Sequence, residues 1–288
     1  MNSSQTEVTF RASPDWADVV VLTVDVEDYF MSPESIPCED WPSYEPMIQV
    51  GMDRILNILD EFDVHATFFF LGWVAERWPD LVRCASEKGH EIATHTYDHR
   101  YVSTLSQAQF AGSVQKSLAI LRKLAPGQPV HGHRAPAFSL NAKKVWQFDI
   151  LREHGIVYDS SINPHATYLY GDRSALRFPH RLHGLMEIPP GAIEIAGIRL
   201  PVGGGGTLRI LPEWYLKRAR RRHQSEGYAP VIYVHPWEFV PEHPKIKLPL
   251  KQHLIHWTGI HTTEKKVRSI LSCSRVITMS EYYRRLTG

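Results

Sequence analysis

The feature that most constrains this chain is a repeated unit in which a helical pattern stops at a glycine and a short apolar strand then ends in a polar residue. Three such units occur, and they stop at Gly89, Gly155 and Gly227 before strands that lead to His95, Asp159 and His235. A glycine is the usual residue just past a helix end because it tolerates the left-handed backbone there. Helices that alternate with buried strands predict an α/β fold with a parallel sheet.

The first strand is expected over residues 18–26 (DVVVLTVDV), a continuous β-branched run of the kind that is covered on both faces. A helix over residues 50–62 and a second buried strand over 66–71 follow it. Polar residues at the carboxyl ends of successive parallel strands meet on one face, where barrels of this type place their active sites. The interval 164–206 loses this periodicity and is expected to hold a β-rich insertion.

Length and composition indicate one enzyme-sized domain over residues 1–288, since 43% of the residues are hydrophobic and 22% are charged. A net charge of +1 gives no field that favours nucleic acid. The three cysteines form no C-x-x-C pair and suit a reducing cytoplasm. The first 18 residues lack the apolar core of a signal peptide, and no apolar run is long enough to span a membrane. A cytoplasmic protein is therefore expected.

Three carboxylates lie at the end of the first expected strand and just after it, in the order Asp25, Glu27 and Asp28. Acids this close repel one another when buried unless a cation or an arginine compensates their charge. They could instead cap the turn after the strand, which is a common position for Asp and Glu. The segment alone leaves both interpretations open.

Two histidines four residues apart, His95 and His99, follow the strand expected over residues 91–94. If the chain turns helically there, both imidazoles lie on one face, as a metal ion requires. Two histidines with one carboxylate form a catalytic zinc set with positions left for water and substrate, although the same ligands hold other divalent ions. Because a chain with 16 histidines also produces H-x-x-x-H by chance, the position at a strand end carries the argument.

Arg134 and His235 are two further candidate site residues. Arg134 precedes the proline-fixed turn at Pro136, and its guanidinium suits the orientation of a carboxylate through a forked hydrogen bond. The alternative is an ordinary surface turn. His235 ends the strand over residues 230–234 and would face the same mouth as His95, although a lone histidine there is more often structural. Trp237, beside His235, is placed against a sugar ring because aromatic faces stack on the apolar faces of sugars.

Taken in order, these segments resemble the five motifs of the polysaccharide deacetylase family of carbohydrate esterases. The resemblance spans residues 20–239 and rests on Asp25-x-Glu27-Asp28, His95-x-x-x-His99, Arg134-x-Pro136-x-Phe138, Tyr158-Asp159 and His235. The segments VDVEDYF, GHRAPAFS, YDSSI and YVHPWEF, with the glycine run 203–206, are similar to the exosortase-associated exopolysaccharide deacetylases. This resemblance implies a distorted (β/α) barrel of parallel strands, with a core over about residues 18–240 and a C-terminal extension to residue 288.

The resemblance also implies an activity, which is removal of N-acetyl groups from N-acetylhexosamine units of a bacterial exopolysaccharide or its precursor by a divalent-metal-dependent hydrolase. In the metal site it implies that His95, His99 and either Glu27 or Asp28 hold the ion, for which zinc is expected. The common family pattern has two adjacent aspartates, whereas Val26 separates Asp25 from the next acid in this chain. Strand alternation turns Asp25 and Glu27 to the same side, which favours Glu27.

The remaining roles implied by the resemblance concern the reacting groups. Asp25 would act as the general base and be held by Arg134, while His235 would protonate the departing amine. The backbone N–H of Ala137 would help to hold the oxyanion. Two rival functions are hydrolysis of a small cyclic or linear amide and carbohydrate binding without catalysis, and the intact set of acid, histidine and arginine argues against the second.

Two conspicuous segments are assigned no catalytic role. The basic run of residues 217–222 lies in an expected helix, where such runs are usually solvated faces, although this one could contact an anionic glycan or a lipid-linked pyrophosphate. The glycine run 203–206 lacks the lysine and Ser/Thr of a phosphate-binding loop and is expected to form a turn.

Overall fold

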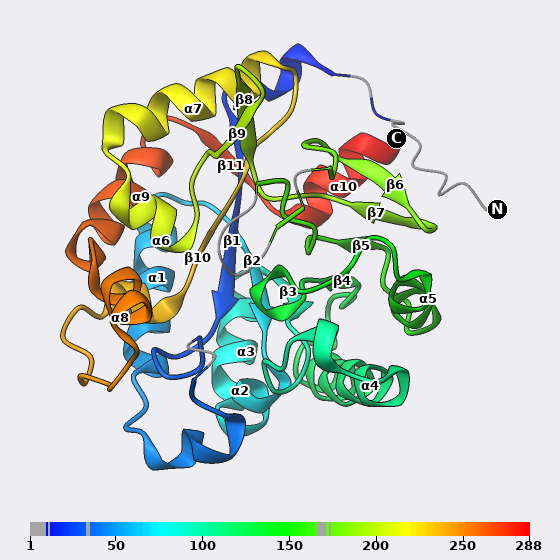
Figure 1. The fold of residues 1–288 in the computed structure, drawn as a ribbon, viewed down its shortest axis with the longest axis vertical. Helices are drawn as coiled ribbons and strands as arrows, with labels where there is room; N and C mark the ends of the chain where they lie inside the picture. Colours follow the sequence, from blue (N-terminus) through cyan, green and yellow to red (C-terminus); the bar gives the residue numbers. More distant parts are fainter. Residues whose placement is uncertain (1–9, 11, 33–34, 166–170, 173) are drawn as a thin grey trace.

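A curled and largely parallel sheet runs through the centre of the molecule (Figure 1). The computed structural model describes residues 10, 12–32, 35–165, 171–172 and 174–288, so most of the leader before residue 12 lies outside the described residues. The strand order is β10-β1-β2-β3-β4-β5-β7-β6, and β11 also pairs with β1. The strands of this sheet are β1 (Val19–Val26), β2 (Thr67–Phe70), β3 (Glu91–Thr94), β4 (Gly132–His133), β5 (Tyr158–Asp159), β6 (His180–Leu182), β7 (Leu185–Glu187), β10 (Val231–Val234) and β11 (Arg275–Ile277).

Helices cover the sheet (Figure 1). The helices are α1 (Ile48–Glu61), α2 (Gly72–Arg77), α3 (Pro79–Glu87), α4 (Gln107–Leu124), α5 (Val145–Glu153), α6 (Gly205–Ile210), α7 (Glu213–Ser225), α8 (Leu250–Trp257), α9 (Thr263–Leu271) and α10 (Met279–Thr287). Among the described residues, no helix has the length and apolar character needed to cross a membrane. The glycines at positions 89, 155 and 227 all have positive φ just after a helix, as the sequence pattern predicts.

Alternate residues of β1 enter two separate cores. Val20, Leu22 and Val24 pack with the apolar faces of α1, α3, α4 and α5 on the outer side of the sheet. Val19 and Val21 point to the inner side, where they join a cluster with residues of the C-terminal helix α10. This period of two explains why β1 reads as a continuous apolar run, because both of its faces are buried.

The sheet forms a half-barrel in a mixed α/β fold, which confirms the predicted fold class. Its strand ladder ends at β10 on one side and at β6 on the other, and the segment after β7 contacts both β5 and β10, since Ile188 N–H donates to Asp159 O and Gly191 N–H donates to Val231 O. The expected β-rich insertion is also present in its described part. It contains β6 and β7 and a separate hairpin of β8 (Ala192–Ile195) and β9 (Ile198–Pro201).

The N-terminal ends of the strands are closed by the start of α10. Glu91, the first residue of β3, accepts hydrogen bonds from Ser280 N–H (2.8 Å) and Tyr158 OH (2.6 Å), and Met279 N–H donates to Thr67 Oγ1 (2.8 Å). The C-terminal extension therefore plugs the end of the half-barrel that lies away from the site described below.

One helix begins later than the sequence predicts. Asn141 is a residue type that commonly caps a helix, and a helix capped there would run to His154, but α5 runs only from Val145 to Glu153. Asn141 Oδ1 accepts the N–H of Lys143 at 2.9 Å, so the side chain that would cap a helix instead closes a turn ahead of it.

Candidate metal centre and active site

A pocket opens at the carboxyl ends of the parallel strands, where the sequence places the candidate residues. Strand ends or the loops that follow them supply the acids, histidines and turn residues, and the C-terminal half supplies the opposite wall. The lining residues are Asp25, Glu27, Ser32, His95, His99, Tyr101, Ala135, Ala137, Phe138, Gly205, Gly206, Arg209, Tyr233, His235, Trp237, Leu248, Gln252, Ile255 and His256.

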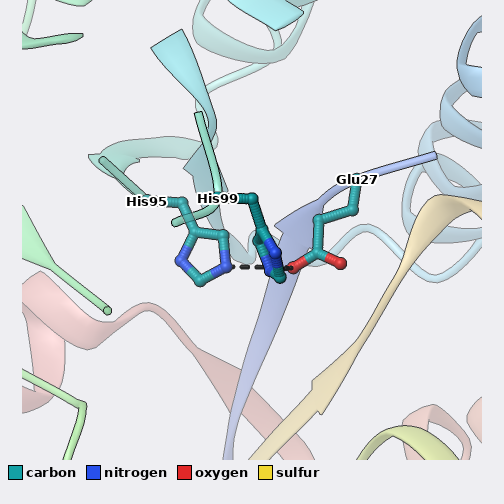
Figure 2. Close-up of side chains that lie close together, drawn as sticks. All are labelled: Glu27, His95 and His99. Atoms are coloured by element: carbon teal, nitrogen blue, oxygen red, sulfur yellow. Dashed lines mark hydrogen bonds and ion pairs between the residues drawn. The ribbon is translucent and has the colours of Figure 1, made fainter. Parts of the chain in front are cut away.

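Glu27, His95 and His99 line this pocket, and Figure 2 shows that their side chains point toward one another. Glu27 Oε1 lies 3.0 Å from His95 Nε2 and 2.9 Å from His99 Nε2. These three side chains, called the metal group below, each offer one ligand atom for an ion. The three atoms all lie within 4.8 Å of one another. His95 and Glu27 are almost completely buried and His99 is 9% exposed.

The hydrogen bonds of His95 indicate the tautomer of its imidazole, that is, which ring nitrogen carries the proton. Nδ1 lies 2.7 Å from the carbonyl oxygen of Arg134, so Nδ1 carries the proton and donates it. In neutral His95 the lone pair on Nε2 then faces Glu27 Oε1 at 3.0 Å. Two acceptors at this distance repel unless a proton or a cation lies between them, so the donor set fits a divalent cation.

The second carboxylate oxygen of Glu27, Oε2, does not face the two histidines and is hydrogen-bonded to Ser32 instead. Ser32 Oγ donates a short hydrogen bond to Oε2, and Trp237 Nε1 donates to Ser32 Oγ at 3.2 Å. This arrangement leaves Oε1 as the oxygen directed at the two imidazoles. Burial by itself raises the pKa of Glu27, but the imidazoles of His99, His235 and His95 outweigh it and hold the pKa well below its usual value.

The backbone brings the two histidines together in a way that differs from the helical turn suggested by their spacing. Residues 95–99 form a non-helical loop in which Thr96 (φ 65°) and His99 (φ 55°) adopt left-handed conformations. Non-glycine residues with such φ values carry strain that surrounding contacts must offset. Here the loop is anchored by Gly72 N–H, which donates to Thr96 O, and by Trp73 N–H, which donates to Tyr97 O.

Asp28 lies outside the metal group, so its inclusion among the candidate ligands is corrected. Its Oδ2 accepts the N–H groups of Met47 (2.7 Å) and Ile48 (2.9 Å) at the start of α1, and its Oδ1 accepts the N–H of Tyr29 (2.9 Å). Carboxylates commonly satisfy the unpaired N–H groups of a helix N-terminus in this way. The capping interpretation of the acidic segment therefore holds for Asp28.

Asp25 and Arg134 form a buried ion pair beside the metal group. Arg134 Nη1 donates to Asp25 Oδ1 at 2.7 Å and to Thr23 Oγ1 at 2.8 Å. The rest of the guanidinium donates to Ser160, from Nη2 to Oγ (3.0 Å) and from Nε to the carbonyl oxygen (3.2 Å), and its carbon lies 4.3 Å from the ring centroid of Phe69. Arg134 is therefore a fully buried orienting group, and the alternative of an ordinary surface turn is excluded.

His235 lies across the pocket and belongs to a chain of alternating charges. Its Nδ1 lies 3.1 Å from Glu238 Oε2, and Glu238 Oε1 lies 2.7 Å from Arg209 Nε. Burial opposes the charged form of His235, but the carboxylates of Glu238, Glu27 and Asp25 outweigh burial and raise its pKa to about 9. The imidazole therefore holds a proton through the neutral range.

Ala137 and Trp237 also line the pocket, with different exposures. Ala137 has a left-handed backbone (φ 49°, ψ 29°) inside the short turn Pro136–Phe138. Trp237 is only 3% exposed, and one face of its indole is stacked on His256 with a 4.2 Å centroid separation. Trp237 thus offers far less area to a sugar ring than its position in the sequence suggests.

Asp159, the acid of the fourth motif, does not line the pocket. Its Oδ1 lies 2.6 Å from His133 Nδ1 and also accepts the hydroxyl of Ser161. Ser161 Oγ in turn accepts the N–H of Ala135, next to Arg134. Asp159 therefore does not face the pocket but stabilises, through Ser161, the turn on which Arg134 and Ala137 lie.

Sequence reasoning assigned no role to Arg209, Glu238, Ser32 or Ser160. Glu238 carries a detectable signal, because it lies three residues after His235, and Ser160 follows Asp159 directly. Arg209 lies on α6 and pairs with Glu238, and these two residues are too far apart in the sequence to form a short motif. Ser32 follows β1, and its contact with Trp237 joins residues 205 positions apart in the sequence.

Comparisons with known proteins agree with this geometry. The sequence pattern described as polysaccharide deacetylase matches residues 17–158, and that of a domain of unknown function (DUF3473) matches residues 160–284. The chain is similar to a peptidoglycan-N-acetylglucosamine deacetylase of Bacillus cereus, with 36% identity over 76 residues (26% of this chain and 28% of that protein). It is similar to a chitooligosaccharide deacetylase of Sinorhizobium fredii, with 32% identity over 98 residues (34% and 43%). The alignments thus span less than half of either relative.

Solved structures share the fold over nearly the whole chain. A protein assigned as a polysaccharide deacetylase from Mycobacterium smegmatis superposes with a TM-score of 0.64 at 20% identity, covering 98% of this chain and 94% of the other. The Bc1960 peptidoglycan N-acetylglucosamine deacetylase gives 0.53 at 16% identity, covering 96% and 92%. BA3943 from Bacillus anthracis, described as a CE4 family pseudoenzyme, gives 0.52 at 16% identity, covering 95% and 67%.

Proposed function

Because this chain belongs to the polysaccharide deacetylase family, we propose that it removes N-acetyl groups from N-acetylhexosamine units of a bacterial exopolysaccharide or of its precursor. The observation that carries the proposal is the convergence of Glu27, His95 and His99 beside the Asp25–Arg134 ion pair in one pocket. The similar proteins named above are deacetylases of peptidoglycan and chitooligosaccharide, which supports an N-acetylated glycan as the substrate class.

Glu27, His95 and His99 would hold the divalent cation, and zinc is the ion that we propose. One carboxylate oxygen and two imidazole nitrogens are a common ligand set of catalytic zinc, which leaves room for water and substrate. When bound, such an ion polarises the amide carbonyl and lowers the pKa of a water molecule. Elemental analysis of the purified protein, and reconstitution with zinc, cobalt, manganese or nickel after chelation, test the choice of ion.

We propose that the remaining groups carry out the proton transfers of amide hydrolysis. Asp25 would accept the proton of the attacking water as general base, and its hydrogen bond from Arg134 holds the carboxylate in place. His235, whose proton is retained by Glu238 and the other nearby carboxylates, would donate to the departing nitrogen. The N–H of Ala137 would contribute to the oxyanion site, and Trp237 would form part of the wall that surrounds the sugar.

Acetate release from N-acetylglucosamine oligomers is the direct test of this function. Asp25→Asn preserves the shape of the base and is expected to keep bound metal while losing roughly 10²- to 10⁴-fold in rate, the usual contribution of a general base. His95→Ala is expected to lose the metal itself, because it removes one of three ligands. An Asp25→Asn variant that releases acetate at the wild-type rate would contradict the assignment of the base.

The two rival functions give different results in the same assay. Release of acetate or ammonia only from small cyclic or linear amides, with none from the oligomers, would indicate a small-molecule amidohydrolase. Binding of the oligomers without turnover, in protein loaded with metal, would indicate a carbohydrate-binding protein. A protein that shares this fold, BA3943, is described as a pseudoenzyme, so the fold alone does not establish catalysis.

We also propose that the protein works in a reducing compartment such as the bacterial cytoplasm. Cys38, Cys84 and Cys273 are all free thiols in the structure. Disulfides are rare where glutathione or thioredoxin keeps thiols reduced. Thiol titration of protein quenched with acid directly from cells should find three reactive groups, whereas fractionation that places the protein outside the inner membrane would contradict the proposal.

A further inference from the structure

Helix α7 presents a stripe of basic residues to solvent on the flank of the molecule opposite the β6–β7 hairpin (Figure 1). Its buried side contains Leu216, Ala219 and His223, which pack toward the core. The exposed side follows the spacing i, i+3, i+4, i+7, i+8 and i+11, and these residues together line a shallow hollow: Trp214, Lys217, Arg218, Arg221, Arg222 and Ser225.

The positive charge of this stripe is largely uncompensated. Arg222 lies 3.5 Å from Glu226, but within the described part of the chain Lys217, Arg218 and Arg221 form no ion pair. Glu213, the one acid within α7, instead accepts a hydrogen bond from Ser269 of α9. Since the whole chain has a net charge of only +1, these side chains concentrate positive charge on one face of a nearly neutral protein.

Large apolar side chains are also exposed on α6, α7 and α8, and these helices lie along the left side of Figure 1. Trp214, at the start of α7, is 70% exposed, and Ile210, at the end of α6, is 49% exposed. On α8, Leu250 (75%) and Leu254 (56%) are also exposed. Helix α8 packs beside α6, since a Cβ at Gly206 would lie 3.5 Å from Ile255, and Ile255 lines the active-site pocket together with Gln252 and His256.

We propose that this flank, formed by the basic stripe of α7 with Trp214 and by the exposed leucines of α8, docks on a membrane that contains anionic phospholipids. Basic side chains gain electrostatic energy near the negative headgroups, and tryptophan and leucine gain by entering the boundary between headgroups and acyl chains. The flank adjoins the pocket through α8, so docking would bring the active-site mouth near the membrane surface.

The combination of charges and apolar side chains distinguishes this occupant from the others. A soluble polyanion would neutralise the stripe but would leave Trp214 and Leu250 exposed to water. A second copy of the chain placed symmetrically on this face would oppose like charges across the interface. An anionic bilayer accommodates both kinds of side chain.

Sedimentation with lipid vesicles tests the proposal on the full chain, without metal or substrate. The wild-type protein is expected to bind vesicles of equal parts phosphatidylcholine and phosphatidylglycerol, to remain free with phosphatidylcholine alone, and to be released by salt. Each basic residue near such a surface contributes roughly five-fold in partitioning, or about 1 kcal/mol. The test variant combines Lys217→Gln, Arg218→Gln and Arg221→Gln, which removes the three unpaired charges of the stripe. It should bind the anionic vesicles roughly 100-fold more weakly than the wild type.

A matched control removes the same charge from other surfaces. It carries glutamine at three exposed basic positions of α4, β6 and α10, which are Lys123, Arg181 and Arg284. The control should bind vesicles within about two-fold of the wild type, since its charges lie away from the flank. An equal loss in both triple variants would reduce the effect to net charge and overturn the proposal, as would a wild-type protein that fails to bind anionic vesicles.

Trp214→Ala separates the membrane from a soluble polyanion. The variant should bind anionic vesicles more weakly while its affinity for dextran sulfate stays unchanged, because only the bilayer receives the indole. If Trp214→Ala binds the vesicles as well as the wild type does, the stripe is a polyanion site and the membrane proposal fails. Because no measurement involves catalysis, loss of the proposed deacetylase function would leave these results intact.

Discussion

Replacing Arg134 with methionine should cost more stability than any change on the surface of this protein, because it leaves a buried carboxylate without its partner. Arg134 is fully buried and donates hydrogen bonds to Asp25, Thr23 and Ser160. Methionine has a similar length and removes all of these donors. Breaking a buried ion pair in this way typically costs about 3–5 kcal/mol.

The expected change in melting temperature follows from the size of the chain. Unfolding entropy near 60 °C is about 2.1 cal/mol/K per residue, which gives about 0.6 kcal/mol/K for 288 residues. A loss of about 3–5 kcal/mol therefore lowers the melting temperature by roughly 5–8 °C. Circular dichroism during heating, with a chelator present so that metal binding does not contribute, measures this change.

A double-mutant cycle shows whether the cost comes from the ion pair. Asp25→Asn removes the negative charge, so Arg134→Met should cost about 1–3 kcal/mol less in that background than in the wild type. Arg83 provides a matched control, since it pairs with Asp80 on the surface, and Arg83→Met should cost at most about 1 kcal/mol. Additive effects of Asp25→Asn and Arg134→Met, or a melting temperature unchanged by Arg134→Met, would refute the reasoning.

Three further predictions concern groups around the pocket. Asp28→Ala removes the acceptor at the start of α1, so unfolding measurements should show a loss of about 1–3 kcal/mol, while bound metal measured by elemental analysis stays unchanged. Ser32→Ala frees one oxygen of Glu27, and chelator competition should show metal affinity roughly 10- to 100-fold weaker. Glu238→Gln removes a carboxylate that raises the pKa of His235 to about 9, so the alkaline limb of the pH–rate profile should move to lower pH; an unmoved limb would show that His235 is not the acid.

The fold and the approximate location of the site follow from short-range signals in the sequence. Gly89, Gly155 and Gly227 mark the helix ends because each requires a positive φ that other residues rarely adopt. The strands they precede are parallel, so residues that follow them, such as His95 and His235, necessarily meet at one edge of the sheet.

Details that depend on contacts between distant segments could not be predicted in the same way. Strand alternation favours Glu27 over Asp28 but does not show where Asp28 lies, because that depends on the position of α1, whose first N–H groups donate to Asp28. The histidine spacing suggested a helical turn, whereas strained backbone at Thr96 and His99 achieves the same convergence. The sequence places Trp237 against a sugar ring, but the stacking of His256 on its indole is a contact between separate segments that no local pattern indicates.

The division of the chain between two family patterns does not divide the active site. The polysaccharide deacetylase pattern, over residues 17–158, contains Asp25, Arg134 and the metal group. His235 and the wall formed by α6 and α8 belong to the region matched by the domain of unknown function, residues 160–284. Under the proposed mechanism, the general acid His235 and one wall of the pocket come from the second region, so a protein limited to the first would lack the proton donor that we propose for the leaving amine. If the proposed roles hold, the second region is part of the catalytic unit, and we expect differences in glycan selectivity among chains with this arrangement to map to α6 and α8.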